Sequence, residues 1–126
     1  MLAIGFVVCG LAVWFAVAFR DTRSQIATTK ARRPNPSRDE FIEMMAWDCP
    51  EYVAVFLWET AMPYLAPHPD DDLLRDLPID EDDWSMDWPR DFATQEGFHE
   101  SNLPDWPKGW ATTIRNYGRW LSMGPV

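Results

Sequence analysis

The chain has 126 residues, 20 of them acidic and 11 basic, and a formal net charge of −9. The charge is uneven, because residues 20–38 carry six bases and one acid, whereas residues 39–126 carry 19 acids and five bases. The phosphates of DNA and RNA repel so acidic a region, which argues against nucleic-acid binding.

Residues 1–19 contain no charged side chain. A helix of that length is roughly 28 Å long, close to the hydrocarbon thickness of a bilayer, about 30 Å. We therefore expect a single transmembrane helix over residues 1–19. A cleaved signal peptide is the alternative, since Ala16-Val17-Ala18 resembles a cleavage site. The absence of Lys and Arg before Arg20 and the length of the apolar stretch favour an uncleaved anchor.

A basic juxtamembrane linker is expected over residues 20–37, with a turn at Pro34-Asn35-Pro36 that holds the domain off the bilayer. Positive residues beside a span stay in the cytoplasm, so we expect an inner-membrane protein of a bacterium with a cytoplasmic C-terminal domain. Signal cleavage would instead give a periplasmic protein. Five cations are expected at the membrane surface, where each contributes about 1 kcal/mol with anionic head groups. They are Arg20, Arg23, Lys30, Arg32 and Arg33.

The acidic domain, residues 38–126, begins with clear helix signals. Ser37 and Glu40 have capping-box spacing, which predicts a helix from residue 38. Pro50 suits the first turn of a second helix, expected from Glu51 to Met62 and ended by Pro63.

The later part of the domain is also predicted to be helical, with Pro-rich irregular loops. A short helical turn follows Asp72, and a helix is expected from Pro89 to Gly97. Residues 102–109 should be irregular, and Thr112 or Thr113 should cap a last helix. Because no stretch alternates with period two, the fold class is mostly α, a small helical bundle.

Eight tryptophans are present, seven of them after the predicted anchor. Such large rings can close a small core, and a partly exposed aromatic patch is the alternative. One tripeptide occurs twice, as Asp87-Trp88-Pro89 and Asp105-Trp106-Pro107. We interpret the two copies as similar turns or helix entries, since the residue before proline avoids helical geometry.

No signature of catalysis or metal binding is present. A calcium loop starting at Asp80 would need glycine where Ser85 stands, and neither His68 nor His99 has a zinc-site spacing to a second ligand. We therefore predict no metal, no cofactor and no enzymatic activity.

Three segments resemble acyl carrier proteins. Residues 72–83 resemble the entry to that family's second helix, residues 92–98 are similar to its end, and residues 111–114 resemble the start of the last helix. Gly118-Arg119-Trp120 is similar to a tripeptide near the end of small acyl-carrier-like proteins of unknown function. The resemblance implies an antiparallel four-helix bundle. The family's Asp-Ser-Leu motif is not matched, and Ser85 is the serine nearest to the place where a phosphopantetheine arm would attach.

The leading hypothesis is a membrane-anchored, non-catalytic protein that presents its acidic domain to a basic or membrane-bound protein partner. Acids would steer the partner and rings would contact it. The predicted partner-binding residues are Asp70, Asp71, Asp72, Asp80, Glu81, Asp82, Asp83, Trp84 and Trp88. One alternative is an acyl-carrier-like protein, modified at Ser85 if it is functional. Another is an immunity protein that neutralises a toxin.

Overall fold

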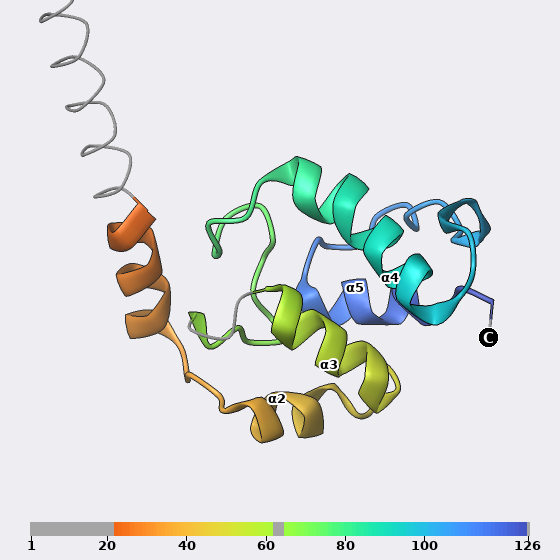
Figure 1. Ribbon diagram of the computed structural model, residues 1–126. Coiled ribbons are helices and arrows are strands. Elements are labelled where there is room, and N and C mark those ends of the chain that lie inside the picture. The colour runs from red at the N-terminus through yellow and green to blue at the C-terminus, as the bar shows by residue number, and fades with distance from the viewer. Residues whose placement is uncertain (1–21, 62–64, 126) are drawn as a thin grey trace, which may run out of the picture.

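The computed structural model of the protein describes residues 22–61 and 65–125 (Figure 1). Its helices with defined bounds are α2 (Arg38–Met45), α3 (Glu51–Thr60), α4 (Trp88–Glu96) and α5 (Ile114–Leu121). The described residues also include a π-helical turn η2 (Asp83–Asp87), a 3-10 turn η3 (Glu100–Asn102) and a helical stretch over residues 22–32. Between residues 22 and 125, apart from 62–64, there is no strand, only an isolated bridge from Asp72 to Thr113. The prediction of a mostly helical domain is confirmed.

The predicted anchor, residues 1–19, and Arg20 lie outside the described residues. Among the helices that are described, none has the length and apolar character needed to cross a membrane.

The helix starts follow the local sequence. The Ser37 side chain accepts a hydrogen bond from the Glu40 backbone N–H, and the Glu40 carboxylate accepts one from the Ser37 backbone N–H. The predicted capping box is therefore formed. Pro50 is the N-cap of α3, which ends at Thr60, before the expected Met62. Met62 and Pro63 are outside the described residues. Thr113 caps α5 by accepting the Asn116 N–H.

The helix around Pro89 begins earlier than expected. Residues 81 and 82 are already helical, and η2 joins them to α4, which ends at the left-handed Gly97 (φ 79°). The Trp88 N–H reaches back to the Asp83 carbonyl, a π-type bond, and the next residue is Pro89, which has no N–H to donate. Proline would break the hydrogen-bond pattern of a regular α-helix, and the π turn before it lets the helix continue.

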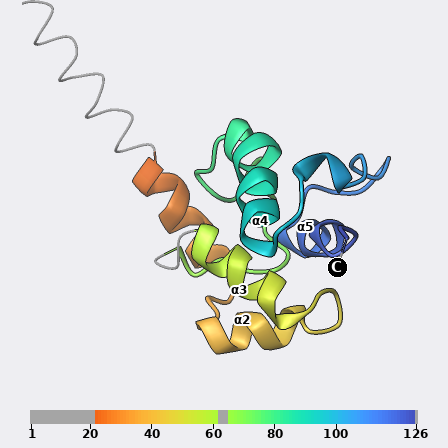
Figure 2. The ribbon, with the colours of Figure 1, turned by 45° about the vertical axis from the view of Figure 1, so that its right-hand side comes forward.

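Helix α3 lies between α2 on one side and α4 and α5 on the other (Figures 1 and 2). The Phe41 ring of α2 lies 5.4 Å from the Trp58 ring of α3, measured between centroids. On the other side, Phe56 meets Phe92 of α4 edge to face at 5.2 Å. These aromatic contacts place α3 at the centre of the core.

Helix α5 approaches the α2–α3 corner closely at Gly118. A Cβ atom there would lie 2.7 Å from Met45 Cε and 3.1 Å from Cys49 Sγ. Met45 and Cys49 are buried, so the missing side chain of Gly118 is what allows the helices to pack.

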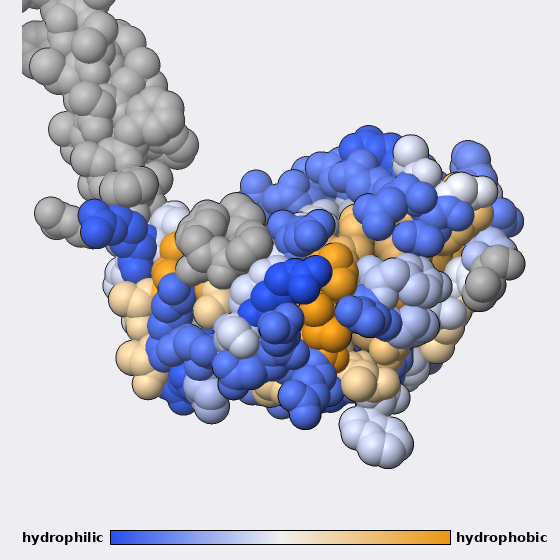
Figure 3. Space-filling model, turned by 60° about the horizontal axis from the view of Figure 1, so that its bottom comes forward, coloured by the Kyte–Doolittle hydropathy of each residue, from blue (hydrophilic) through white to orange (hydrophobic). Residues whose placement is uncertain are grey.

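Only part of the tryptophan content forms the core. Trp58 and Trp88 are buried. Four others are half-buried: Trp84, Trp106, Trp110 and Trp120. Trp47, in the turn after α2, is 97% exposed. The face in Figure 3 is hydrophilic for the most part, with a central hydrophobic strip and paler hydrophobic areas near its edges.

Part of the segment expected to be a juxtamembrane linker is helical and contacts the domain. We call residues 22–32, orange in Figure 1, the docking helix. Thr29 is buried, and its hydroxyl donates to the Asp76 carbonyl at 2.7 Å. Gln25 donates to the Arg75 carbonyl at 3.0 Å, and Arg32 pairs with the Asp76 carboxylate. The docking helix therefore belongs to the folded unit.

Candidate partner-binding site

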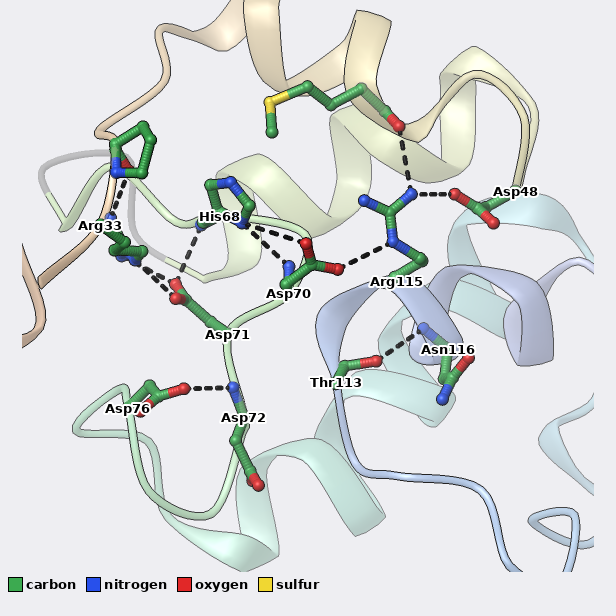
Figure 4. Close-up of polar contacts among 12 residues, drawn as sticks. Arg33, Asp48, His68, Asp70, Asp71, Asp72, Asp76, Thr113, Arg115 and Asn116 are labelled. Carbon is green, nitrogen blue, oxygen red and sulfur yellow. Dashed lines mark hydrogen bonds and ion pairs between the residues drawn. The ribbon is translucent and has the colours of Figure 1, made fainter.

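Asp71 is the most buried of the predicted partner-binding acids, with 2% of its side chain exposed. Arg33 donates to both of its oxygens, from Nε at 2.6 Å and from Nη2 at 2.8 Å, and the His68 backbone N–H adds a third bond at 2.9 Å (Figure 4). Such a bidentate pair fixes both side chains. Asp71 and Arg33, expected at a partner-binding surface and at the membrane surface, therefore pair with each other inside the fold.

Asp72 also makes internal contacts. One of its carboxylate oxygens accepts the Leu74 N–H at 2.8 Å and the Thr112 hydroxyl at 3.1 Å. Its own N–H donates to the Asp76 carboxylate (Figure 4). Burial by itself would raise the pKa of Asp76, but the hydrogen bonds from the Asp72 N–H and Arg32 outweigh it and hold the pKa below its ordinary value. These acids organise the turn.

Asp70 is exposed but is paired with Arg115 of α5 at 3.0 Å. Arg115 also binds the Asp48 carboxylate and the Met44 carbonyl (Figure 4), and Arg119 reaches Asp48 at 2.6 Å. Burial would lower the pKa of Arg115, but its bonds to Asp70 and Asp48 outweigh that effect and raise it. Asp48 thus ties α5 to the α2–α3 corner, and Asp70 ties α5 to the loop that follows α3.

The second acidic cluster lies on the surface. Asp80, Glu81 and Asp82 are exposed and Asp83 is half-buried. They stand at the start of the helical stretch 81–96, where negative charge interacts favourably with the helix dipole. We call Asp80, Glu81 and Asp82 the acidic rim.

Next to the acidic rim in the chain, Trp84 and Ser85 help to line a hollow of about 240 Å³. We call it the aromatic hollow. Its other lining residues are Pro104, Asp105, Trp106, Tyr117 and Trp120. Trp88 does not line it and packs instead in the core, edge to face with Tyr117 at 5.4 Å.

Trp106 lies at the centre of a ring cluster. Its centroid is 5.9 Å from that of Tyr117, 5.7 Å from that of Trp120 and 6.0 Å from that of Trp110. The Trp120 indole N–H donates to the Pro104 carbonyl at 2.8 Å, which fixes the loop that carries Trp106. The cluster therefore forms a supported wall of the hollow.

The Trp84 indole differs from its neighbours. Its N–H is buried, and within the described part of the chain it has no hydrogen-bond partner. Its backbone carbonyl accepts the Tyr117 hydroxyl, and burial raises the pKa of Tyr117 well above its ordinary value. Tyr117 thus stays neutral, and its hydroxyl already donates to a backbone carbonyl.

Ser85 is exposed, and no histidine is bonded to it among the contacts described. The ring nitrogens of His68 and His99 accept backbone N–H groups two residues ahead, from Asp70 and Ser101. Across residues 22–61 and 65–125, no group of three or more His, Cys, Asp or Glu side chains is arranged to hold a metal ion.

Asp105, Trp106 and Trp120 were not among the residues predicted from the sequence. The repeated Asp-Trp-Pro tripeptide drew attention to Trp106, but its two copies differ in structure. Trp88 begins α4 and is buried, whereas Trp106 lies in an irregular loop beside the hollow. Only the fold shows that residues 84, 106 and 120 meet.

Comparisons with models of known protein families, with curated proteins and with solved structures found no match. The resemblance to acyl carrier proteins remains a prediction.

Proposed function

We propose that the protein is a membrane-anchored, non-catalytic interaction protein that presents its acidic domain to a basic protein partner. The observation that carries the proposal is that the exposed acidic rim lies just before Trp84 and Ser85 in the chain, and that these two residues line the aromatic hollow. Acidic residues would attract the partner and the rings would contact it.

Charge supports this proposal, because residues 39–126 hold 19 acids and five bases. A field of one sign speeds the encounter with an oppositely charged partner. Anchoring through residues 1–19 would raise the effective concentration near a partner that is itself at the membrane. Since the acids at positions 70–72 are engaged in internal contacts, the proposed surface consists of the acidic rim, Asp83 and Trp84.

The test uses the full chain in detergent micelles and a nona-arginine peptide as a basic probe. We expect binding that weakens as salt rises, since salt screens exposed charges. Neutralising the acidic rim with D80N, E81Q and D82N should weaken binding more than D91N, E96Q and E100Q, which remove three other exposed acids. Binding that ignores salt, or equal effects of the two triple variants, would contradict the proposal.

A carrier function at Ser85 is a second candidate, favoured by the exposure of Ser85 within the helical stretch 81–96. Co-expression with a phosphopantetheinyl transferase should then add the prosthetic arm and raise the intact mass, and S85A should abolish the increase. An unchanged mass of the unmodified sequence would eliminate this candidate.

A further inference from the structure

We infer that the aromatic hollow binds the guanidinium group of an arginine side chain of the partner. The inference rests on the proposed function and identifies the group that this surface recognises.

The size of the hollow favours one side chain as its occupant. Pockets for small-molecule ligands generally measure about 300–1,000 Å³, whereas the aromatic hollow measures about 240 Å³. It is too small for a typical whole ligand and suits the end of one long side chain that projects from a larger partner.

The rings around the hollow favour a cation. Trp84, Trp106, Tyr117 and Trp120 contribute to its wall, and the faces of such rings attract a positive charge, with tryptophan the strongest. Arginine fits better than lysine, because a planar guanidinium stacks on rings and is less strongly hydrated than an ammonium group.

Charge complementarity points to the same occupant. Asp105 lies in the lining of the hollow and is exposed, so its carboxylate can meet a guanidinium. Residues 80–113, which include the acidic rim and the loop that carries Trp106, contain nine acids and two bases. One of those bases, Arg90, is already paired with Asp87 and Asp91. An apolar or acidic side chain would gain nothing from this field.

The first experiment compares three peptides against the full chain in detergent micelles: nona-arginine, nona-lysine and nona-citrulline. Citrulline keeps the shape of arginine without its charge. We expect nona-arginine to bind about threefold or more tightly than nona-lysine, on the scale of a cation–π contact, and nona-citrulline not to bind. In NMR spectra, nona-arginine should shift the indole N–H signals of Trp106 and Trp120, while that of the exposed Trp47, which does not line the hollow, stays in place.

The second experiment removes one charge at the hollow. D105N should weaken nona-arginine binding about threefold, as expected for a partly exposed ion pair. D39N is the matched control, because it removes the same charge from an exposed side chain on α2 and should leave the affinity unchanged. Both positions are exposed, so neither variant endangers folding.

The replacement W84F tests the contribution of the rings, because phenylalanine has a smaller ring face that attracts a cation less strongly than tryptophan does. It should weaken nona-arginine binding by about threefold to tenfold, with an unchanged circular dichroism spectrum.

Equal affinity for the arginine and lysine peptides, or equal effects of D105N and D39N, would overturn the inference. So would unshifted Trp106 and Trp120 signals at saturating nona-arginine. In each case the proposed function still stands if binding depends on salt and on the acidic rim. Failure of nona-arginine to bind at all would overturn both.

Discussion

Arg33 and Asp71 are 38 residues apart in the chain and form a bidentate pair with 11% and 2% of their side chains exposed. Removing one partner of a buried ion pair leaves the other charge unpaired, which costs about 3–5 kcal/mol. We expect Asp71→Asn to lower the free energy of unfolding by about 3 kcal/mol, at the low end because Arg33 retains access to water. Denaturant unfolding followed by circular dichroism measures this loss.

Asp70→Asn is the control at the neighbouring position. The Asp70 side chain is 65% exposed, and exposed ion pairs contribute about 1 kcal/mol or less. If the two asparagine variants lose equal stability, the structural role assigned to Asp71 is wrong.

Cys49 is expected to resist alkylation in the folded protein. Burial raises the pKa of its thiol from 9.0 to about 11. The negative charge of Asp48 adds a smaller increase, and the positive charge of Arg115 opposes both effects. The thiolate is the reactive form, and it is scarce at any pH well below 11. Iodoacetamide at pH 8 should therefore leave the Cys49 peptide unmodified in native protein and modify it fully in urea, as read by mass spectrometry. Rapid native labelling would contradict this burial.

At the level of helices, Gly118 sets how closely α5 packs. Alanine generally stabilises a helix by about 1 kcal/mol relative to glycine. Here the added methyl would meet Met45 and Cys49 in the core, and overpacking costs about 1–3 kcal/mol. We expect Gly118→Ala to destabilise the protein by about 1 kcal/mol net, measured by thermal or denaturant unfolding. A more stable variant would show that Met45 moves aside freely.

The contact between the docking helix and Asp76 should depend on acid. The pKa of Asp76 is lower in the folded protein than its ordinary value of 3.8, so protons bind the unfolded chain more readily. The stabilisation from the Asp76 charge is therefore complete above pH 3.8 and is lost as the pH falls below that value. Asp76→Asn should destabilise the protein at pH 7, and the difference from the unmodified sequence should shrink below pH 3.8.

Denaturant unfolding of both proteins across this range measures that difference. Other acids titrate in both proteins and cancel. A difference that stays constant down to pH 2 would rule out this role for the Asp76 charge.

Local chemistry accounts for most of what could be predicted about the helices. The Ser37 capping box, the Thr113 cap and the Gly97 terminus depend on neighbouring residues, and all three form as expected. The position of the docking helix depends on Thr29, and on Arg33 just after the helix, meeting a carbonyl and a side chain some 40 residues later. No local pattern contains that pairing. A basic stretch with paired prolines therefore resembled a spacer.

At the scale of the whole molecule, the expected topology places the acidic domain in the cytoplasm. This orientation is a proposal that rests on the asymmetry of Lys and Arg around residues 1–19. In spheroplasts, external protease should spare the domain, and it should digest the domain once the membrane is permeabilised. A C-terminal epitope tag reports the result. Digestion in intact spheroplasts would overturn the orientation, and release of the tagged domain into the periplasm would indicate cleavage of the leader.

The candidate site illustrates where sequence reasoning stops. The acidic rim and Trp84 are close together in the chain, so the sequence alone predicts them as a group. Asp105, Trp106 and Trp120 reach the same hollow from a loop and from α5, so their association depends on helix packing. Conversely, Asp71 belongs to a run of acids that is typical of a solvated turn. Only the contact with Arg33 shows that its side chain is buried.

The Arg33 contact also determines where the chain can be divided. A fragment that begins at residue 38, the boundary suggested by the charge pattern, would discard Arg33 and leave the buried Asp71 carboxylate without its counter-ion. It would also uncover the loop surface that Thr29 and Gln25 occupy. A fragment meant to fold by itself therefore has to keep Gln25, Thr29 and Arg33, and a version without them would lose stability through truncation alone, whatever its binding properties.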